Sequence, residues 1–410
     1  MDDFHSFCGA GLPAKPAVTS VAARTAGANL TRFGVFLHDM GRIAVISAFN
    51  CHNYGMYSVD LAAEQFFNEL GLPFTQIVTQ QRTRTGRLQF HLRRQPSEFA
   101  VFDRVVYWGD FLNNPMWGAV DYSHREVQRH GVTGREQAGK NWQELYLNLK
   151  RYHPALRVFA IGGCFLGAAG TGLERFRRPL EEFLQSAELV MPRDEPSFEM
   201  VQRLAPAGRV RQGMDCAWLL PVEPARKAAA SSHFICFLGR TLRRRQPRLA
   251  GELARATGLR AVWIDWLNLR PPRFLAHWNF SRMRRLIAGA RFVVTDTYHL
   301  AVNALNQGIP TICLYDAKQS AEQGTCGDAK KRALMEEAGL AAQLVDVGEP
   351  GSLARRIRER LAASDPAEAA AAFAQIAQRR TDFRKFLRQA LGKTAPTESA
   401  VNSCSRVEVN

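Results

Sequence analysis

Several features that would place this chain in a familiar class are missing from the sequence. No apolar run approaches the ~20 residues that a membrane-spanning helix needs, and the start of the chain, with Asp2 and Asp3, lacks the basic and then apolar segments of a secretory signal. We therefore expect a cytoplasmic protein. No HExxH, Walker, GxSxG or GxGxxG motif stands at a strand-to-helix junction, so zinc protease, P-loop, α/β-hydrolase and nicotinamide chemistry have no support.

Paired cysteines are also missing. The chain has 8 cysteines and no CxxC pair, and Cys164, Cys236 and Cys313 lie in or beside apolar stretches. Buried, reduced thiols in a reducing compartment explain this usage better than disulfides or zinc ligands. We expect neither a metal nor a cofactor.

The excess of positive charge, +16, first suggests nucleic acid, because basic surfaces collect phosphates. No nucleic-acid motif accompanies the charge, and the basic clusters are scattered at 82–87, 175–178, 242–245 and 282–285. We expect no nucleic-acid partner and interpret most of these clusters as solvated helix faces. Anionic small molecules, or a peripheral contact with lipid phosphates at the inner face of the cytoplasmic membrane, are the alternatives that fit the charge.

Length and the order of segments indicate two domains. The chain has 410 residues, which exceeds one ordinary core, and apolar strand patterns alternate with amphipathic helix patterns on both sides of a Pro-, Ala- and Ser-rich connection at 221–232. We predict a leader without stable structure (1–40), an N-terminal α/β domain on the acceptor side (41–222), a C-terminal α/β domain on the donor side (233–392) and a flexible tail (393–410). Two doubly wound, Rossmann-like domains facing a cleft are similar to the two-domain (GT-B) glycosyltransferase architecture.

The expected elements follow from these patterns. Strands are expected at 42–49, 74–79, 88–92, 102–108, 157–161, 188–191, 210–218, 233–239, 261–264, 292–295, 311–315 and 343–347. Helices are expected at 56–70, 136–150, from 173, from 195, and at 247–257, 280–288, 300–306, 328–338, 352–363 and 366–391. The aromatic and asparagine-rich segment 111–122 is predicted to be a binding loop.

The stretch 291–316 carries the strongest site signal. A buried strand pattern ends at Asp296, Tyr298 and His299, and a short helix and a second strand follow. Ligands of parallel sheets bind beyond the carboxyl ends of the strands. His299 is suited to general acid/base work or to pairing with a phosphate, and Asp296 is suited to capping the helix or to holding the imidazole in one tautomer. An N-cap aspartate beside a structural histidine is the alternative.

Weaker candidates follow other strands. Gly162 and Gly163 could offer amide donors to an anion, or could only allow a tight turn. Arg193 could place a guanidinium at an anion site, or could be an exposed residue beside a helix cap. Arg240 follows a strand where a phosphate contact is expected, although a solvent-facing arginine is the default. Each is therefore a candidate with an ordinary structural alternative.

Polar residues after the first and third strong strands of the first domain form a further group. Asn53, Tyr54 and Asp110 offer the amide, aromatic and carboxylate partners that sugar hydroxyls need. Turn chemistry explains the same residues and remains open.

Three segments resemble the polysaccharide pyruvyltransferase family: VVTDTYHLAVNALNQGIPTICL (293–314), AELVMPRDEPSFEMVQRL (187–204) and GMDCAWLL (213–220). The resemblance implies transfer of a pyruvyl group from phosphoenolpyruvate, as the donor substrate, to a sugar of a bacterial surface polysaccharide or its lipid-linked precursor, often as a ketal. It further implies that His299 and Arg193 contact the phosphate or carboxylate of the donor. Among the neighbouring residues, we predict that Asp296 is catalytic together with His299 and that Thr297 and Tyr298 bind substrate.

The chain departs from the family pattern at two positions of this signature, one of which is Leu300, where the family usually has a small residue. The family often has arginine where this chain has Thr297, and Arg240, Lys318 or Lys330 would then supply the missing charge. A two-domain glycosyltransferase with a nucleotide-sugar donor is the second hypothesis, and a non-catalytic binding protein is the third.

Overall fold

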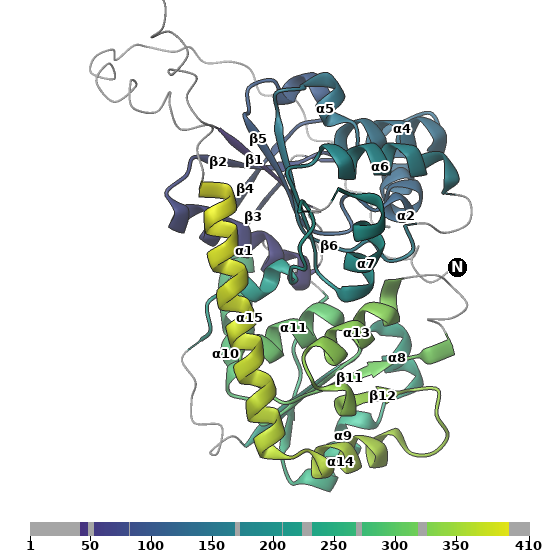
Figure 1. The fold of residues 1–410 in the computed structure, drawn as a ribbon. Coiled ribbons are helices and arrows are strands. Elements are labelled where there is room, and N and C mark those ends of the chain that lie inside the picture. Colours follow the sequence, from purple (N-terminus) through teal and green to yellow (C-terminus); the bar gives the residue numbers. More distant parts are fainter. Residues whose placement is uncertain are drawn as a thin grey trace, which may run out of the picture. The chain divides into compact units, whose positions relative to one another are not determined.

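The computed structural model describes residues 42–47, 53–81, 83–168, 173–206, 208–223, 232–267, 273–318 and 326–392. The expected leader, the tail and most of the connection at 221–232 lie outside these ranges. Strands and helices alternate along the described chain and build two sheets (Figure 1). The α/β class with two mostly parallel, doubly wound sheets is therefore confirmed, whereas the exact domain boundaries stay a prediction.

The first sheet has seven strands in the order β3-β4-β2-β1-β5-β6-β7. All neighbours are parallel except β3 and β4. The strands are β1 (Ile43–Ser47), β2 (Phe74–Val78), β3 (Thr83–Thr85), β4 (Leu88–Leu92), β5 (Arg104–Asp110), β6 (Arg157–Gly163) and β7 (Leu189–Pro192). The central strand β1 is buried at every residue, as a parallel strand covered on both faces must be.

The second sheet has five parallel strands in the order β12-β11-β10-β8-β9. They are β8 (His233–Phe237), β9 (Arg260–Val262), β10 (Val293–Thr295), β11 (Thr311–Tyr315) and β12 (Leu344–Asp346). The carboxyl ends of β10 and β11 are thus neighbours, and both precede residues that the sequence singles out.

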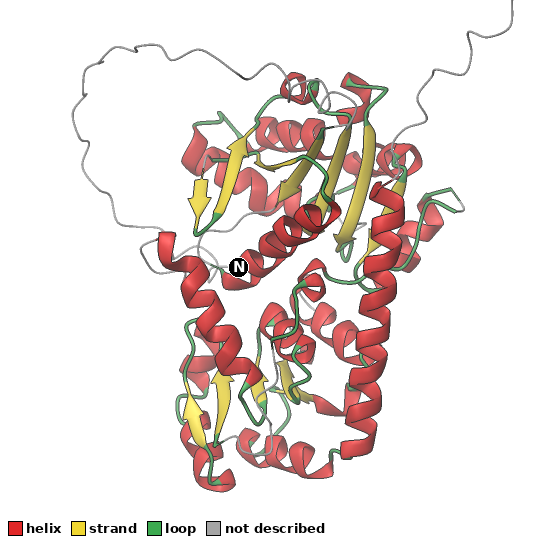
Figure 2. Ribbon diagram, turned by 90° about the vertical axis from the view of Figure 1, so that its left-hand side faces the viewer, coloured by secondary structure: helices red, strands yellow, loops and turns green. Residues whose placement is uncertain are grey.

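Helices lie on both faces of each sheet (Figure 1, Figure 2). Around the first sheet they are α1 (Tyr54–Leu70), α2 (Pro115–Trp117), α3 (Ser123–His130), α4 (Arg135–Tyr146), α5 (Leu149–Tyr152), α6 (Arg177–Ser186) and α7 (Glu195–Leu204). The later helices are α8 (Arg240–Arg245), α9 (Leu249–Thr257), α10 (Ala276–Ala288), α11 (Tyr298–Asn306), α13 (Cys326–Glu337), α14 (Leu353–Ala363) and α15 (Pro366–Gly392). Even α15, the longest of the described helices, lacks the unbroken apolar stretch that crossing a bilayer requires.

Two predictions about local structure are wrong. The expected strand at 210–218 does not form: only Val210 bridges to Val190, and the chain then turns into the 3₁₀ helix η5 (Cys216–Leu219), because the Asp215 carboxylate accepts a bond of 2.9 Å from the Ala217 amide. The expected binding loop at 111–122 is mostly helical, as α2 followed by a π-helical turn. Asn114 caps it and also donates to the carbonyls of Cys164 and Leu166, which occupies its amide within the fold.

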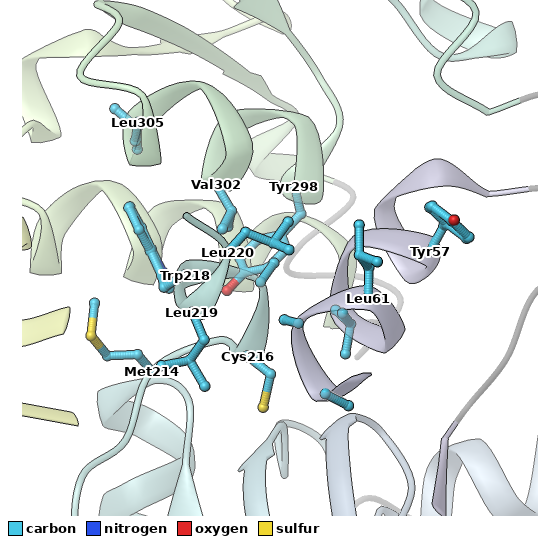
Figure 3. Close-up of a cluster of buried hydrophobic side chains, with 14 of the residues drawn as sticks. Tyr57, Leu61, Met214, Cys216, Trp218, Leu219, Leu220, Tyr298, Val302 and Leu305 are labelled. Atoms are coloured by element: carbon cyan, nitrogen blue, oxygen red, sulfur yellow. The ribbon is translucent and has the colours of Figure 1, made fainter. Parts of the chain in front are cut away.

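One hydrophobic cluster contains residues of both sheets, including Val45 of β1 and Val293 of β10. Its middle is formed by three elements (Figure 3): Tyr57 and Leu61 come from α1, Trp218 and Leu219 from η5, and Val302 from α11. Helix α11 is buried along its whole length, and its polar residues His299, Asn303 and Asn306 make their polar contacts within the fold. The position of its first turn, where the candidate histidine lies, is therefore fixed by packing on several sides.

The last helix contacts elements from both halves of the chain. Arg379 pairs with Glu337 of α13, and Arg380 donates to Asn306 of α11. Arg384 pairs with Glu69 of α1. The helix thus joins segments that are far apart in the sequence.

Candidate functional site

The guanidinium of Arg193 lies at the centre of a buried cluster of charges. The residue follows β7, and its amide donates to the Gly163 carbonyl at 2.9 Å, so that the side chain leaves from the carboxyl edge of the first sheet. Three carboxylates surround the fully buried guanidinium: Asp215 at 3.2 Å, Asp194 at 3.6 Å and Asp110 at 3.8 Å. Burial alone lowers the pKa of Arg193, but Cys164, Tyr298, Asp215 and Asp110 raise it well above its usual value. Arg193 thus keeps its positive charge although it is fully buried.

Asp110 reaches this cluster through an unusual backbone conformation. Its φ of 54° lies in the left-handed region, which residues other than glycine rarely adopt, and it directly follows Gly109 with a φ of 75°. The turn lets the Asp110 carbonyl accept a bond of 2.7 Å from the Cys164 amide while the carboxylate turns toward Arg193. Strain of this kind is concentrated at functional sites.

Two aromatic rings and a second cation complete the surroundings of Arg193. The guanidinium carbon lies 4.6 Å from the ring centre of Tyr298 and 5.1 Å from that of Phe111. The ammonium of Lys330, from α13, lies 5.4 Å and 5.1 Å from the same two ring centres. Two cations thus share one aromatic wall, an arrangement that cation–π attraction favours.

His299 reaches the cluster from the first turn of α11. Its Nε2 lies 3.4 Å from Oδ2 of Asp215, the same oxygen that contacts Arg193. Burial raises the pKa of the Asp215 carboxyl, but His299, Arg193 and the Ala217 amide outweigh burial and bring it to about 2. Asp215 is therefore ionised at neutral pH and holds both the Arg193 guanidinium and the His299 imidazole in place.

Helix α1 presses directly against His299. A Cβ atom on Gly55 would stand 2.6 Å from Cβ of His299, so only glycine fits there. Asn303 donates to the His299 carbonyl at 2.8 Å and to the Ser58 hydroxyl of α1 at 3.2 Å. The imidazole is thus positioned by contacts from both halves of the chain.

The cluster has donors left over. Within the described chain, Nε and Nη2 of Arg193 are buried donors without a hydrogen bond, and Nε lies 3.6 Å from Oδ2 of Asp194, a buried acceptor that also has none. Nε2 of His299 makes no further polar contact there beyond the one of 3.4 Å with Asp215. A cavity of about 20 Å³, lined by Arg193, Asp194 and Tyr298 among others, lies beside them and has room for about one water molecule. Because unpaired buried donors are costly, the arrangement is suited to an anion whose oxygens accept from Arg193 and His299.

The predicted residues at the edge of the second sheet form a separate group. Asp296 accepts a bond of 2.7 Å from the Gly239 amide and does not form an ion pair with His299. We predicted from the sequence that Asp296 could hold the imidazole of His299. In the structure Asp215 lies beside the imidazole instead. Burial raises the pKa of Asp296 despite the Gly239 amide and Lys331.

The remaining predicted residues of this edge are near Asp296 in the chain or in the sheet. Thr297 is the N-cap residue of α11, without a side-chain cap bond, and its hydroxyl lies 3.4 Å from Asp296. Arg240 opens α8, directly after Gly239. Lys318, which is exposed, follows β11. The ligand-binding roles of these three residues stay predictions.

The predicted residues of the first half lie close to Arg193 or His299. Gly162 has a φ of 67° and its missing side chain leaves room for Cys216, which gives the glycine a structural reason. Gly163 supplies the carbonyl that anchors the Arg193 backbone. Asn53 caps α1 by accepting a bond of 2.7 Å from Gly55. Tyr54 is buried and stacks on Phe280 at 6.1 Å, so it packs in the core.

Sequence reasoning missed Asp215 and Asp60 as members of the site region. Asp215 stood in a quoted segment, GMDCAWLL, but was assigned to a strand and given no role. Asp60 of α1 is completely buried. Burial raises its pKa to about 8, although the Ser47 hydroxyl acts to lower it. Asp60 could have been found from the sequence, because it is a single charged residue within an apolar stretch of a predicted helix. Among the described residues no cluster of His, Cys, Asp or Glu is arranged to hold a metal ion.

Comparisons with known proteins bear on the family and on the fold. Residues 146–317 match the family model of the polysaccharide pyruvyl transferases, a segment that includes Arg193, Asp215 and His299. The predicted resemblance is confirmed over that segment, and so is the predicted class of transferase. No curated protein is significantly similar to the chain.

Solved structures that resemble this one share its fold at low sequence identity. The UDP-GlcNAc 2-epimerase of Neisseria meningitidis bound to UDP-GlcNAc has 12% identity and a TM-score of 0.50, over 85% of this chain and 99% of that one. Arabidopsis thaliana UGT89C1 complexed with UDP has 11% identity and a TM-score of 0.47, over 86% and 99%. The similarity to the epimerase, which concerns the fold alone, confirms the GT-B type of architecture predicted from the sequence.

Proposed function

Because residues 146–317 match the polysaccharide pyruvyl transferases, we propose that this transferase moves a pyruvyl group from phosphoenolpyruvate to a sugar of a surface polysaccharide or its lipid-linked precursor. The single observation that carries the proposal is the buried Arg193–Asp215–His299 cluster with its unpaired donors. Phosphoenolpyruvate offers a phosphate and a carboxylate, the two groups that a guanidinium binds best.

The aromatic wall suggests how the chain manages without the arginine that Thr297 replaces. Of the three cations considered for this role, Lys330 is the one whose ammonium lies against the Tyr298 ring that also stacks on Arg193. We assign Lys330 to the donor phosphate. Arg240 and Lys318 lie at the edge of the second sheet and remain open as further contacts.

In the proposed reaction the proton balance requires one acid. A proton from the imidazolium form of His299 is added to the methylene carbon of the donor, which creates an oxocarbenium-like centre. A sugar hydroxyl attacks this centre, and its proton returns to the imidazole. The bond to the phosphate oxygen then breaks, a second hydroxyl closes the ketal, and its proton leaves with the phosphate. His299, held by Asp215, supplies the first proton, and Arg193 stabilises the negative charge on the departing phosphate.

The donor needs more space than the cavity of about 20 Å³ provides. Binding therefore requires the side chains that line this cavity to move apart, which would open the charged cluster to the acceptor as well. Asn53 and Asp110 are the predicted acceptor contacts. Asp110 already faces the site, with its carboxylate 3.8 Å from Arg193.

Phosphate release from phosphoenolpyruvate tests the proposal. With extracts of lipid-linked or polymeric glycans as acceptor, the wild-type protein should release phosphate in an acceptor-dependent way. His299→Ala should reduce kcat by a factor of about 10²–10⁴, whereas His91→Ala, at an exposed position of β4, should leave it unchanged. Full activity of His299→Ala, or release of a nucleotide from UDP-sugars in place of phosphate, would contradict the proposed function and favour the nucleotide-sugar hypothesis.

A further inference from the structure

Exposed apolar side chains are concentrated in one part of the described chain. Of the residues that the structure describes, nine large hydrophobic ones are more than a third exposed, and five of these lie between Trp263 and Trp278. The five are Trp263, Leu267, Phe274, Leu275 and Trp278. Single exposed apolar side chains are common on any protein surface, whereas several of them close together are typical of an interaction site.

Two of these side chains share one face of a helix with two arginines. The 3₁₀ helix η7 (Arg273–Leu275) runs directly into α10. Phe274, Trp278, Arg282 and Arg285 follow at helical spacing, and all four are exposed, with Phe274 at 71% and Trp278 at 57%. The outward face of this helix is therefore aromatic at its start and cationic toward its end.

The inward face of α10 is fixed, so rotation cannot bury the aromatic residues. Phe280, Met283 and Ile287 are part of the core. Phe280 stacks on Tyr54 of α1 at 6.1 Å, and His277 lies 3.3 Å from the Tyr57 hydroxyl. Phe274 and Trp278 thus remain on the surface, where their contact with water is unfavourable. A binding partner that covers them would remove this apolar area from water.

The arginines of this face have no carboxylate partner within the described chain. Neither Arg282 nor Arg285 forms an ion pair there, whereas the buried Arg284 between them pairs with Glu223 at 3.1 Å. The outward guanidinium groups are available to an external anion. Arginine binds phosphate groups in a bidentate manner.

We propose that this face, formed by Phe274, Leu275, Trp278, Arg282 and Arg285, docks on an anionic phospholipid bilayer. Tryptophan and phenylalanine insert at the level of the headgroups, and arginines beside them bind lipid phosphates. The net charge of +16 attracts the whole chain to such a surface. Self-association through this face is disfavoured, because a two-fold contact would bring the same arginines of both copies together.

This inference is independent of the proposed reaction, and vesicle binding of the full chain tests it. The wild-type protein should sediment with phosphatidylcholine vesicles that contain phosphatidylglycerol, should not sediment with phosphatidylcholine alone, and should be released by salt. Tryptophan fluorescence should shift to shorter wavelength on binding.

Two double variants should weaken this binding about tenfold or more: Phe274→Ser with Trp278→Ser, and Arg282→Gln with Arg285→Gln. Matched controls are Tyr152→Ser, at an aromatic residue that is 49% exposed, and Arg177→Gln with Arg178→Gln on α6. The controls should bind like the wild type. Because all these side chains are exposed, every variant should keep the wild-type Tm.

Two outcomes would overturn the inference. One is a wild-type protein that ignores anionic vesicles, or patch variants that bind as well as the controls. The other is a concentration-dependent dimer that the Phe274 and Trp278 substitutions dissociate in the absence of lipid, which would make the face a contact between copies.

Discussion

Lys330 gives the sharpest prediction at the scale of single residues. If its ammonium, 5.4 Å from the Tyr298 ring centre, contacts the donor phosphate, then Lys330→Gln removes ground-state binding more than catalysis. We expect KM for phosphoenolpyruvate to rise about tenfold or more, with kcat reduced much less. Steady-state kinetics of phosphate release measure both constants. The control is Lys318→Gln, and a larger effect of this exposed residue would move the assignment to the edge of the second sheet.

Asp60 predicts a pH dependence of stability. Its pKa is about 8 in the folded protein, because burial disfavours the charged carboxylate, and about 4 in the unfolded chain. A raised pKa contributes stability that is present below pH ~4 and is lost as pH rises toward ~8. The free energy of unfolding of the wild type should fall across this window relative to that of Asp60→Asn.

Urea unfolding at several pH values between 5 and 9 measures this difference, as a series of about five points. A constant difference between the wild type and Asp60→Asn would contradict the assignment of a neutral Asp60. Asp382→Asn, at an exposed position of α15, serves as the control and should follow the wild type at each pH.

Sequence reasoning found single site residues better than their partners. Arg193 and His299 were predicted from their places after apolar strands, and the structure brings both to one carboxylate. That carboxylate, Asp215, was not predicted, because a pairing between distant parts of the chain leaves no local pattern. Asp296 was predicted to hold the imidazole, because it is close to His299 in the sequence, but its carboxylate accepts a hydrogen bond from the Gly239 amide instead.

At the scale of elements, the contact between α1 and α11 controls the site. A Cβ at position 55 would meet Cβ of His299 at 2.6 Å and Cγ at 2.9 Å, so Gly55→Ala must displace the imidazole or the helix. We expect a loss of stability of about 1–3 kcal/mol together with a large loss of phosphate release. Thermal unfolding and kinetics on the same preparation measure the two effects.

Gly251→Ala is the matched control for this substitution. Gly251 lies within α9, and its nearest neighbour to a new Cβ is a terminal atom of Arg255 at 3.9 Å. Replacement of a glycine inside a helix should raise stability by about 0.5–1 kcal/mol. If Gly55→Ala and Gly251→Ala change stability and phosphate release to the same extent, the close packing of α1 on His299 is not the reason why position 55 requires glycine.

Helices and strands could be predicted where a sequence pattern is compatible with only one type of secondary structure. The strand at 311–315 was predicted with its observed bounds, because a short apolar run between turn residues fits a buried parallel strand. The run from Met214 to Leu220 looked the same and folds into η5, because its apolar side chains enter the core between α1 and α11 (Figure 3). Periodicity identifies burial in such runs but does not distinguish an extended chain from a tight turn.

At the scale of the whole molecule, α15 holds segments of both halves together, and the question is which contacts do so. Its buried residues Ile376, Phe383, Leu387 and Leu391 recur at helical spacing and join the main core. Its arginines pair with Glu69 at the surface. Exposed ion pairs contribute little, about 0–1 kcal/mol, whereas a buried leucine contributes several times more.

We therefore expect Leu387→Ala to lower the free energy of unfolding by about 2–5 kcal/mol. Glu69→Gln, which removes the partner of Arg384 and Arg388, should lower it by about 1 kcal/mol or less. Denaturant unfolding measures both variants under the same conditions. A larger effect for Glu69→Gln would show that α15 is held by charge and not by its apolar stripe.

The architecture of the whole molecule was predictable because it repeats a simple alternation of strands and helices. What could not be predicted is how closely the two halves meet. The sequence predicted a cleft faced by polar residues of both halves, whereas Arg193, Asp215 and His299 are buried and in contact with each other. Closure of this kind depends on the shapes of α1, η5 and α11 together, which no single segment reveals.

The mass of the product tests the central claim most directly. The wild-type protein is incubated with phosphoenolpyruvate and a glycan acceptor, and the glycan is then analysed by mass spectrometry. We predict a gain of one pyruvic acid less one water, present with the wild type and absent with His299→Ala. A glycan that gains a hexose from a nucleotide sugar, and gains nothing from phosphoenolpyruvate, would contradict the assignment of a pyruvyl transferase.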